Sequence, residues 1–105
     1  MAYPISINDL VDSAHKYAVS RGFWDNLAPS NVTVRLSKLA LITSEIGECV
    51  EAIRVVDGNI AEELADVVIR VFDLAGALDI DLEQAILDKM NRNETTRTTM
   101  HGKLA

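Results

Sequence analysis

The chain has 105 residues, of which 49% are hydrophobic and 25% charged, and its net charge is -6. This apolar fraction excludes intrinsic disorder, and the length fits one domain. Nucleic-acid polymers and membrane surfaces bind clustered Lys and Arg, so the acidic balance argues against both as partners. The single Cys49 excludes a disulfide framework and a Cys-rich zinc site. With no leader sequence and no apolar run near the roughly 18 residues of a membrane span, we expect a cytoplasmic protein.

Apolar residues recur at three- and four-residue spacing along most of the chain, which predicts an all-α fold. The first helix should begin at a capping box over 6–9 and end near Gly22. After a loop over 22–31, a second helix should run from 30–33 to about Val56. A turn over 57–59 leads to a third helix ending near Leu78, and a fourth is expected over 82–94. We therefore predict one four-helix domain over 1–105, with its core at about 30–97 and a tail over 98–105.

The second helix carries an apolar stripe with coiled-coil-like spacing. The stripe consists of Leu36, Leu39, Thr43, Ile46, Val50 and Ile53. Glu45 and Glu48 project from the other side of this helix, which is also partly apolar. Such a helix is expected to be buried, and a chain of this length often buries it against another subunit. We expect a homo-oligomer in which helices of more than one chain complete the bundle.

Two pairs of carboxylates are the most informative residues for function. Glu45 and Glu48 lie three residues apart on the second helix, and Glu63 and Asp66 repeat this spacing on the third. Because a short turn joins these helices, they should run antiparallel with the two pairs facing each other. Such a cluster is tolerated mainly when it is protonated or neutralised by cations, and oxygen ligands select Mg²⁺ or Mn²⁺. The same acids could instead form a solvated helix face.

Other kinds of catalytic site find little support in the sequence. A di-iron carboxylate site needs Glu-x-x-His pairs, and neither His15 nor His101 lies three residues after a Glu. There is no Ser/His/Asp set and no glycine-rich phosphate loop. Phe23 and Trp24, in the loop before the second helix, could stack on a nucleotide base, although a lone Trp in a small helical protein more often belongs to the core or a subunit interface.

With their flanking residues, the carboxylates resemble the MazG-like nucleotide pyrophosphohydrolases, whose signature is Glu-x-x-Glu followed by Glu-x-x-Asp. The similar segments are LITSEIGECVEA over 41–52, EELADVV over 62–68 and KMNRN over 89–93, and the resemblance covers about 38–97. One position departs from the pattern. The family often has Arg three residues after the Asn of its last element, whereas this chain has Thr96 there and Arg97 one residue later.

The resemblance implies hydrolysis of nucleoside triphosphates between the α- and β-phosphates, which yields (d)NMP and pyrophosphate and serves nucleotide-pool housecleaning. It also implies a homodimer or homotetramer. The implied ligands of Mg²⁺, or of Mn²⁺ as a substitute, are Glu45, Glu48, Glu63 and Asp66. We expect catalysis to involve Glu48, as the acceptor of a proton from water, together with Glu45. The expected substrate-binding residues are Lys38, Lys89, Asn93, Arg97 and Trp24.

Two further interpretations remain open at this point. Within the same fold, the enzyme could act on a narrower substrate, such as dUTP, dCTP or phosphoribosyl-ATP. In a different class, the chain could be a non-catalytic helical module for dimerisation or regulation that keeps the acidic pattern. Stabilisation by Mg²⁺ separates the two classes, because a solvated acidic face binds the ion too weakly to stabilise the fold.

Overall fold

The computed structural model describes residues 5–56 and 58–96, which form four helices and no strands. The helices are α1 (Ile7–Ser20), α2 (Val32–Arg54), α3 (Ile60–Ala77) and α4 (Leu82–Thr96). The predicted all-α fold with four elements is therefore confirmed, while the predicted tail over 98–105 lies outside the described residues. No helix in the described part of the chain is long and apolar enough to cross a membrane.

Local signals set both ends of α1. The Asp9 N–H donates to Ser6 Oγ at 3.0 Å, and the Ser6 N–H donates to an Asp9 carboxylate oxygen at 3.1 Å, which completes the predicted capping box. At the other end, Gly22 has a φ of 83°, a conformation that glycine adopts without strain. The N–H groups of Gly22 and Phe23 bond to carbonyls of the last turn in a Schellman motif. This ending places Phe23 and Trp24 directly after α1.

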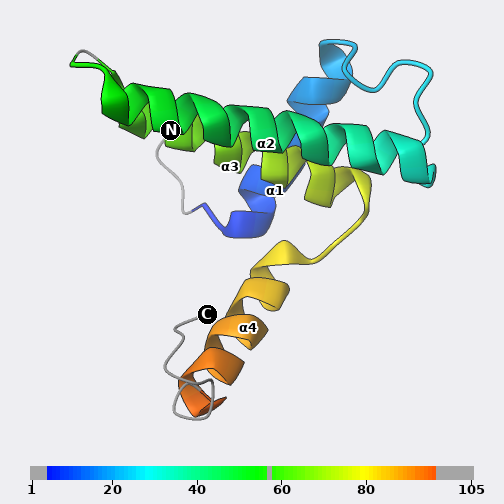
Figure 1. The fold of residues 1–105 in the computed structure, drawn as a ribbon. Coiled ribbons are helices and arrows are strands. Elements are labelled where there is room, and N and C mark those ends of the chain that lie inside the picture. Colours follow the sequence, from blue (N-terminus) through cyan, green and yellow to red (C-terminus); the bar gives the residue numbers. More distant parts are fainter. Residues whose placement is uncertain (1–4, 57, 97–105) are drawn as a thin grey trace.

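The helices α2 and α3 form an antiparallel hairpin (Figure 1). Contacts run in opposite directions along the two helices, because Glu45 meets Arg70, whereas Glu48, further along α2, meets Glu63, which comes earlier in α3. The predicted antiparallel arrangement is confirmed. It presents the acid-bearing side of α2 to α3.

α3 is the central helix, because it packs against both α1 and α2 (Figure 1). α1 approaches α3 closely at Gly76, where an added Cβ would lie only 2.6 Å from the Cβ of His15. This missing side chain lets α1 come close enough for His15 Nδ1 to lie 2.8 Å from an Asp73 carboxylate oxygen. The position of α1 thus depends on a glycine one helical turn beyond a polar contact with α3.

Gly76→Ala is expected to destabilise the fold by about 1–3 kcal/mol, since the new methyl group forces α1 away from α3. Urea denaturation followed by circular dichroism measures this change. Gly47→Ala is the matched control, because a Cβ at this helical position on α2 meets no atom within 4 Å. The control should be neutral or slightly stabilising, as alanine favours helix. Equal losses in the two variants would contradict a close α1–α3 crossing.

α4 projects from the body formed by the other helices and is attached through its N-terminal end (Figure 1). The Asn8 side-chain amide donates to Asp81 at 2.9 Å, and Asn8 also exchanges two hydrogen bonds of 3.2 Å with Glu83. Asp81 caps the helix by accepting the Gln84 N–H at 3.0 Å. The bonds from Asn8 and Gln84 lower the pKa of the Asp81 carboxyl group. Polar contacts therefore fix one end of α4, while most of its length is exposed.

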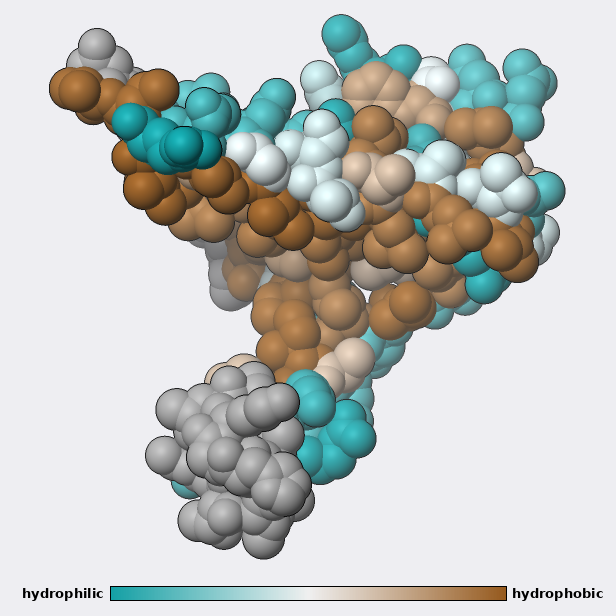
Figure 2. Space-filling model, viewed as in Figure 1, coloured by the Kyte–Doolittle hydropathy of each residue, from teal (hydrophilic) through white to brown (hydrophobic). Residues whose placement is uncertain are grey.

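The apolar stripe of α2 is not covered within one chain. Five of its predicted members are 49–72% exposed, namely Leu36, Leu39, Ile46, Val50 and Ile53. Figure 2 shows apolar surface along α2 that continues over the elements beneath it in the view. Among the residues of α2, only Cys49 is buried. The expected burial of α2 is absent in the single chain, because α3 covers one side of α2 and leaves the stripe facing solvent.

Candidate functional site

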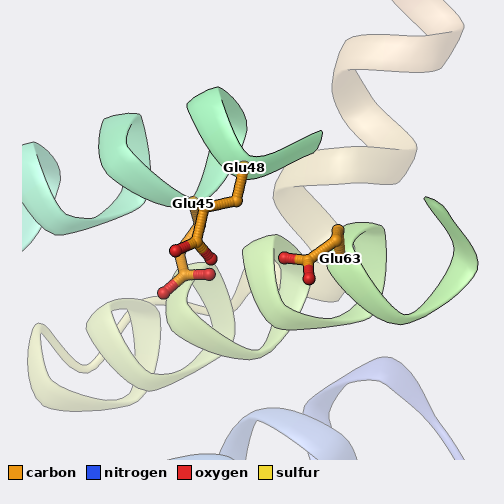
Figure 3. A group of neighbouring side chains, drawn as sticks. All are labelled: Glu45, Glu48 and Glu63. Carbon is orange, nitrogen blue, oxygen red and sulfur yellow. The ribbon is translucent and has the colours of Figure 1, made fainter. Parts of the chain in front are cut away.

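Three carboxylates from two helices converge between α2 and α3 (Figure 3). One oxygen from each of Glu45, Glu48 and Glu63 lies within 4.8 Å of the other two. Glu45 and Glu48 extend from α2 toward α3, and Glu63 points toward them from α3. We call these three residues the carboxylate cluster. Like charges at this spacing repel one another, so the cluster favours either a proton or a bound cation.

Glu63 is the least satisfied member of the carboxylate cluster. Its Oε2 atom is buried and has no hydrogen-bond partner. Burial, followed by the charges of Glu48 and Asp66, raises the pKa of Glu63 above its ordinary value of 4.5. A buried carboxylate oxygen without a partner is uncommon, and the Glu63 side chain that carries it points toward two other carboxylates. This donor set fits a hard divalent cation, which prefers oxygen ligands.

Asp66, the fourth predicted metal ligand, lies three residues beyond Glu63 on α3 and is half-buried. It does not belong to the group whose oxygens meet within 4.8 Å. Its charge nevertheless helps to raise the pKa values of Glu63 and of the buried Cys49 thiol, for which burial is the largest cause. The structure thus brings three of the predicted ligands together and places the fourth beside them. Their role as metal ligands stays a prediction.

Arg70 joins the carboxylate cluster to a neighbouring cavity. Its Nε atom donates to Glu45 Oε1 at 2.8 Å, and the side chains are 38% and 15% exposed, respectively. Arg70 also lines a cavity of about 300 Å³. The other lining residues are Phe23, Lys38, Leu41 and Asp73. Two cationic side chains therefore line a cavity directly beside the carboxylates.

Asp73 ties α3 to α1 and to the loop that follows α1. Its carboxylate accepts the Trp24 Nε1–H at 2.9 and 3.1 Å and lies 2.8 Å from His15 Nδ1. Asp73 is not among the functional residues predicted from the sequence. The available signal was its position seven residues after Asp66 and three after Arg70, which places it on the same face of α3.

Trp24 has the surroundings of a core residue, with only 8% of its surface exposed. Lys38 Nζ lies 4.3 Å from the centroid of its ring and donates to the Phe23 carbonyl oxygen at 2.7 Å. The His15 ring meets Trp24 at an interplanar angle of 74°. By contrast, Phe23 is 48% exposed and lines the cavity. A contact of Trp24 with a nucleotide base stays a prediction, and Phe23 is the aromatic side chain that the cavity presents.

The MazG nucleotide pyrophosphohydrolase domain matches residues 35–98, more than half of the chain, and the match includes the whole carboxylate cluster. The chain belongs to the MazG family. The predicted family is confirmed. Neither a curated protein nor a solved structure matches the chain.

In this MazG domain, the predicted substrate ligands on α4 do not lie at the carboxylate cluster. Lys89 is exposed and Asn93 is half-buried on a helix that projects away from the α2–α3 hairpin (Figure 1). Arg97 lies outside the described residues. Lys38 is the predicted substrate ligand that the fold brings beside the cluster, through the cavity that it shares with Arg70. A role for Lys89, Asn93 and Arg97 in substrate binding stays a prediction.

Proposed function

We propose that the protein is a Mg²⁺-dependent nucleoside triphosphate pyrophosphohydrolase that cleaves (d)NTPs between the α- and β-phosphates to (d)NMP and pyrophosphate. Membership of the MazG family supports hydrolysis of this type of bond. The observation that carries the proposal is the convergence of the Glu45, Glu48 and Glu63 carboxylates, of which Glu63 has a buried oxygen without a hydrogen-bond partner. Removal of unwanted nucleotides from the cellular pool is the role that fits this reaction.

The residues that would hold the cation are the three members of the carboxylate cluster together with Asp66. Their donors are all oxygens, which favour Mg²⁺ or Mn²⁺ over zinc. When bound, such an ion neutralises charge on phosphate oxygens and lowers the pKa of coordinated water. Without the ion, the negative charge of these acids would attract a cation to the site.

Glu48 is the member of the cluster best placed to accept a proton from the attacking water. Glu45 is engaged by Arg70, and one oxygen of Glu63 is buried. The side chain of Glu48 is exposed and has no such cationic partner among the described residues. A carboxylate that water can reach can take the proton on one of its oxygens as bond formation proceeds.

Assembly with further copies of the chain is part of the proposal. The uncovered stripe of α2 supports it, because a monomeric soluble protein rarely exposes a long contiguous apolar patch. The distance of α4 from its own carboxylate cluster is consistent with a homodimer or homotetramer in which α4 serves another copy (Figure 1). Light scattering on the purified protein gives the number of copies.

The test of the proposed reaction is product analysis with a panel of NTPs and dNTPs, including dUTP and dCTP, and with phosphoribosyl-ATP. Each substrate is incubated with Mg²⁺ or with EDTA, and nucleotides, pyrophosphate and phosphate are separated by ion-exchange chromatography. We expect monophosphate and pyrophosphate only when Mg²⁺ is present. Diphosphate and phosphate would contradict the assigned bond. Failure to turn over any substrate, with the fold intact, would leave the non-catalytic module as the better interpretation.

A further inference from the structure

Arg70 occupies the boundary between two environments of opposite charge. On one side, its Nε–H is bonded to Glu45 of the carboxylate cluster. On the other side, its side chain lines the cavity that also contains Lys38. Among the described residues, this is the one hydrogen bond that the guanidinium makes, so its remaining N–H donors have no protein acceptor. Arginine carries five such donors in a planar fork that suits a phosphate group.

The pairing with Glu45 lowers repulsion within the cluster. The Glu45 side chain is only 15% exposed and faces two other carboxylates, so without Arg70 its charge would have little screening from solvent. A divalent cation in the cluster would neutralise the same carboxylates more strongly. Once the ion is present, the positive charge of Arg70 is no longer needed at Glu45 and is repelled by the ion. Occupation of the cluster therefore favours release of Arg70 toward the cavity.

The cavity is suited to receive an anion beside the released guanidinium. Its one acidic lining residue, Asp73, already accepts hydrogen bonds from Trp24 through both carboxylate oxygens and contacts His15. Asp73 forms no ion pair with Lys38 or Arg70. The acid of the cavity therefore neutralises neither cation, and Lys38, which donates to the Phe23 carbonyl oxygen, and Arg70 border the same space next to the carboxylates.

We propose that Arg70 is a substrate-binding residue that pairs with Glu45 while the cluster is empty and, when the cluster holds a divalent cation, binds a phosphate group of the nucleotide in the cavity with Lys38. This inference rests on the proposed function. It assigns Arg70 two successive partners, and each partner can be measured by itself.

The first experiment measures binding of Mn²⁺ alone by isothermal titration calorimetry. Arg70→Gln should bind Mn²⁺ several-fold more tightly than the wild type, because no fixed cation competes for Glu45. Lys16→Gln is the control, since it removes the same charge from an exposed position on α1. It should bind Mn²⁺ as the wild type does. An unchanged Mn²⁺ affinity in Arg70→Gln would overturn the pairing with Glu45 as a competitor of the metal.

The second experiment measures binding of inorganic triphosphate in excess Mg²⁺, which excludes any contribution of the base. Loss of a charge-assisted phosphate contact should weaken binding to Arg70→Gln by about tenfold or more. Lys16→Gln should retain the wild-type affinity. Arg70→Lys keeps the charge but loses the planar fork, so it should bind triphosphate more weakly than the wild type. Wild-type affinity in Arg70→Gln, or in Arg70→Lys if the first variant does not fold, would overturn the inference.

The two experiments separate this inference from the proposed function. If the wild-type protein binds neither Mn²⁺ nor triphosphate and hydrolyses no nucleotide, the proposed function itself is wrong. If the wild type does all three and Arg70→Gln behaves like Lys16→Gln, the function stands and the assignment of Arg70 is wrong.

Discussion

Replacing Glu48 by glutamine is expected to lower the rate of pyrophosphate release by several orders of magnitude while the fold stays intact. The amide removes one negative charge from the carboxylate cluster and cannot accept the proton of the attacking water. General base catalysis alone contributes about 10²–10⁴-fold, and the weakened hold on the cation adds to that loss. Steady-state kinetics on the best nucleotide of the panel measures the effect, and circular dichroism checks the fold.

Asp12→Asn is a matched control for this substitution. It also exchanges an acid for its amide, but at an exposed position on α1 outside the carboxylate cluster. Its rate should equal that of the wild type. A near-normal rate in Glu48→Gln would show that the cluster does not perform the reaction, whatever its affinity for metal.

Glu63→Gln is expected to raise the melting temperature of the metal-free protein and to abolish the further increase that Mg²⁺ gives the wild type. Because the pKa of Glu63 is raised in the fold, the folded state binds more protons than the unfolded state between pH 4.5 and the raised pKa. The contribution of Glu63 to the free energy of unfolding therefore falls as the pH rises from 4.5 to the raised pKa, because the buried carboxyl group must then lose its proton. Glutamine removes this penalty, so the difference in melting temperature between variant and wild type should grow over that interval.

Differential scanning fluorimetry in EDTA and in Mg²⁺, over a series of pH values, measures both effects. The neighbouring Glu62→Gln serves as the control. Glu62 is exposed at the start of α3 and accepts a hydrogen bond from the Asn59 side chain, so its loss should not stabilise the protein. It should also leave the response to Mg²⁺ intact. A Glu63→Gln variant that is less stable than the wild type in EDTA would contradict electrostatic strain at the cluster.

The helices and the carboxylate cluster could be predicted because both depend on local spacing. The capping box at Ser6 and the glycine end at Gly22 act within a few residues, and each gave the correct end of α1. The Glu-x-x-Glu spacing places two acids on one helix face, and a short turn then forces the next helix to return alongside. These relations need no knowledge of the remaining fold.

Contacts between distant segments could not be predicted in the same way. The contacts of Asp73 with His15 and Trp24 form because α1 crosses α3 at Gly76. A single glycine in a helical sequence does not identify which other helix packs against it. Likewise, the direction of α4 depends on Asn8 reaching Asp81 across most of the sequence. The two-sided character of α2 was visible, but spacing alone could not tell which side α3 would cover.

The wall of the cavity beside the carboxylate cluster comes from both inside and outside the stretch that matches the family. The family match begins at residue 35, whereas Phe23, which lines the cavity and holds Lys38 through its carbonyl, comes before it. His15 and Trp24, which fix Asp73 at the cavity wall, also precede the match. The cavity wall thus combines Phe23, from before the match, with four residues from within it, whereas the carboxylate cluster lies wholly within the match. If the nucleotide binds in this cavity as proposed, a substitution at Phe23 would reshape its wall without altering a carboxylate, and relatives with the same acids would not need to share a substrate.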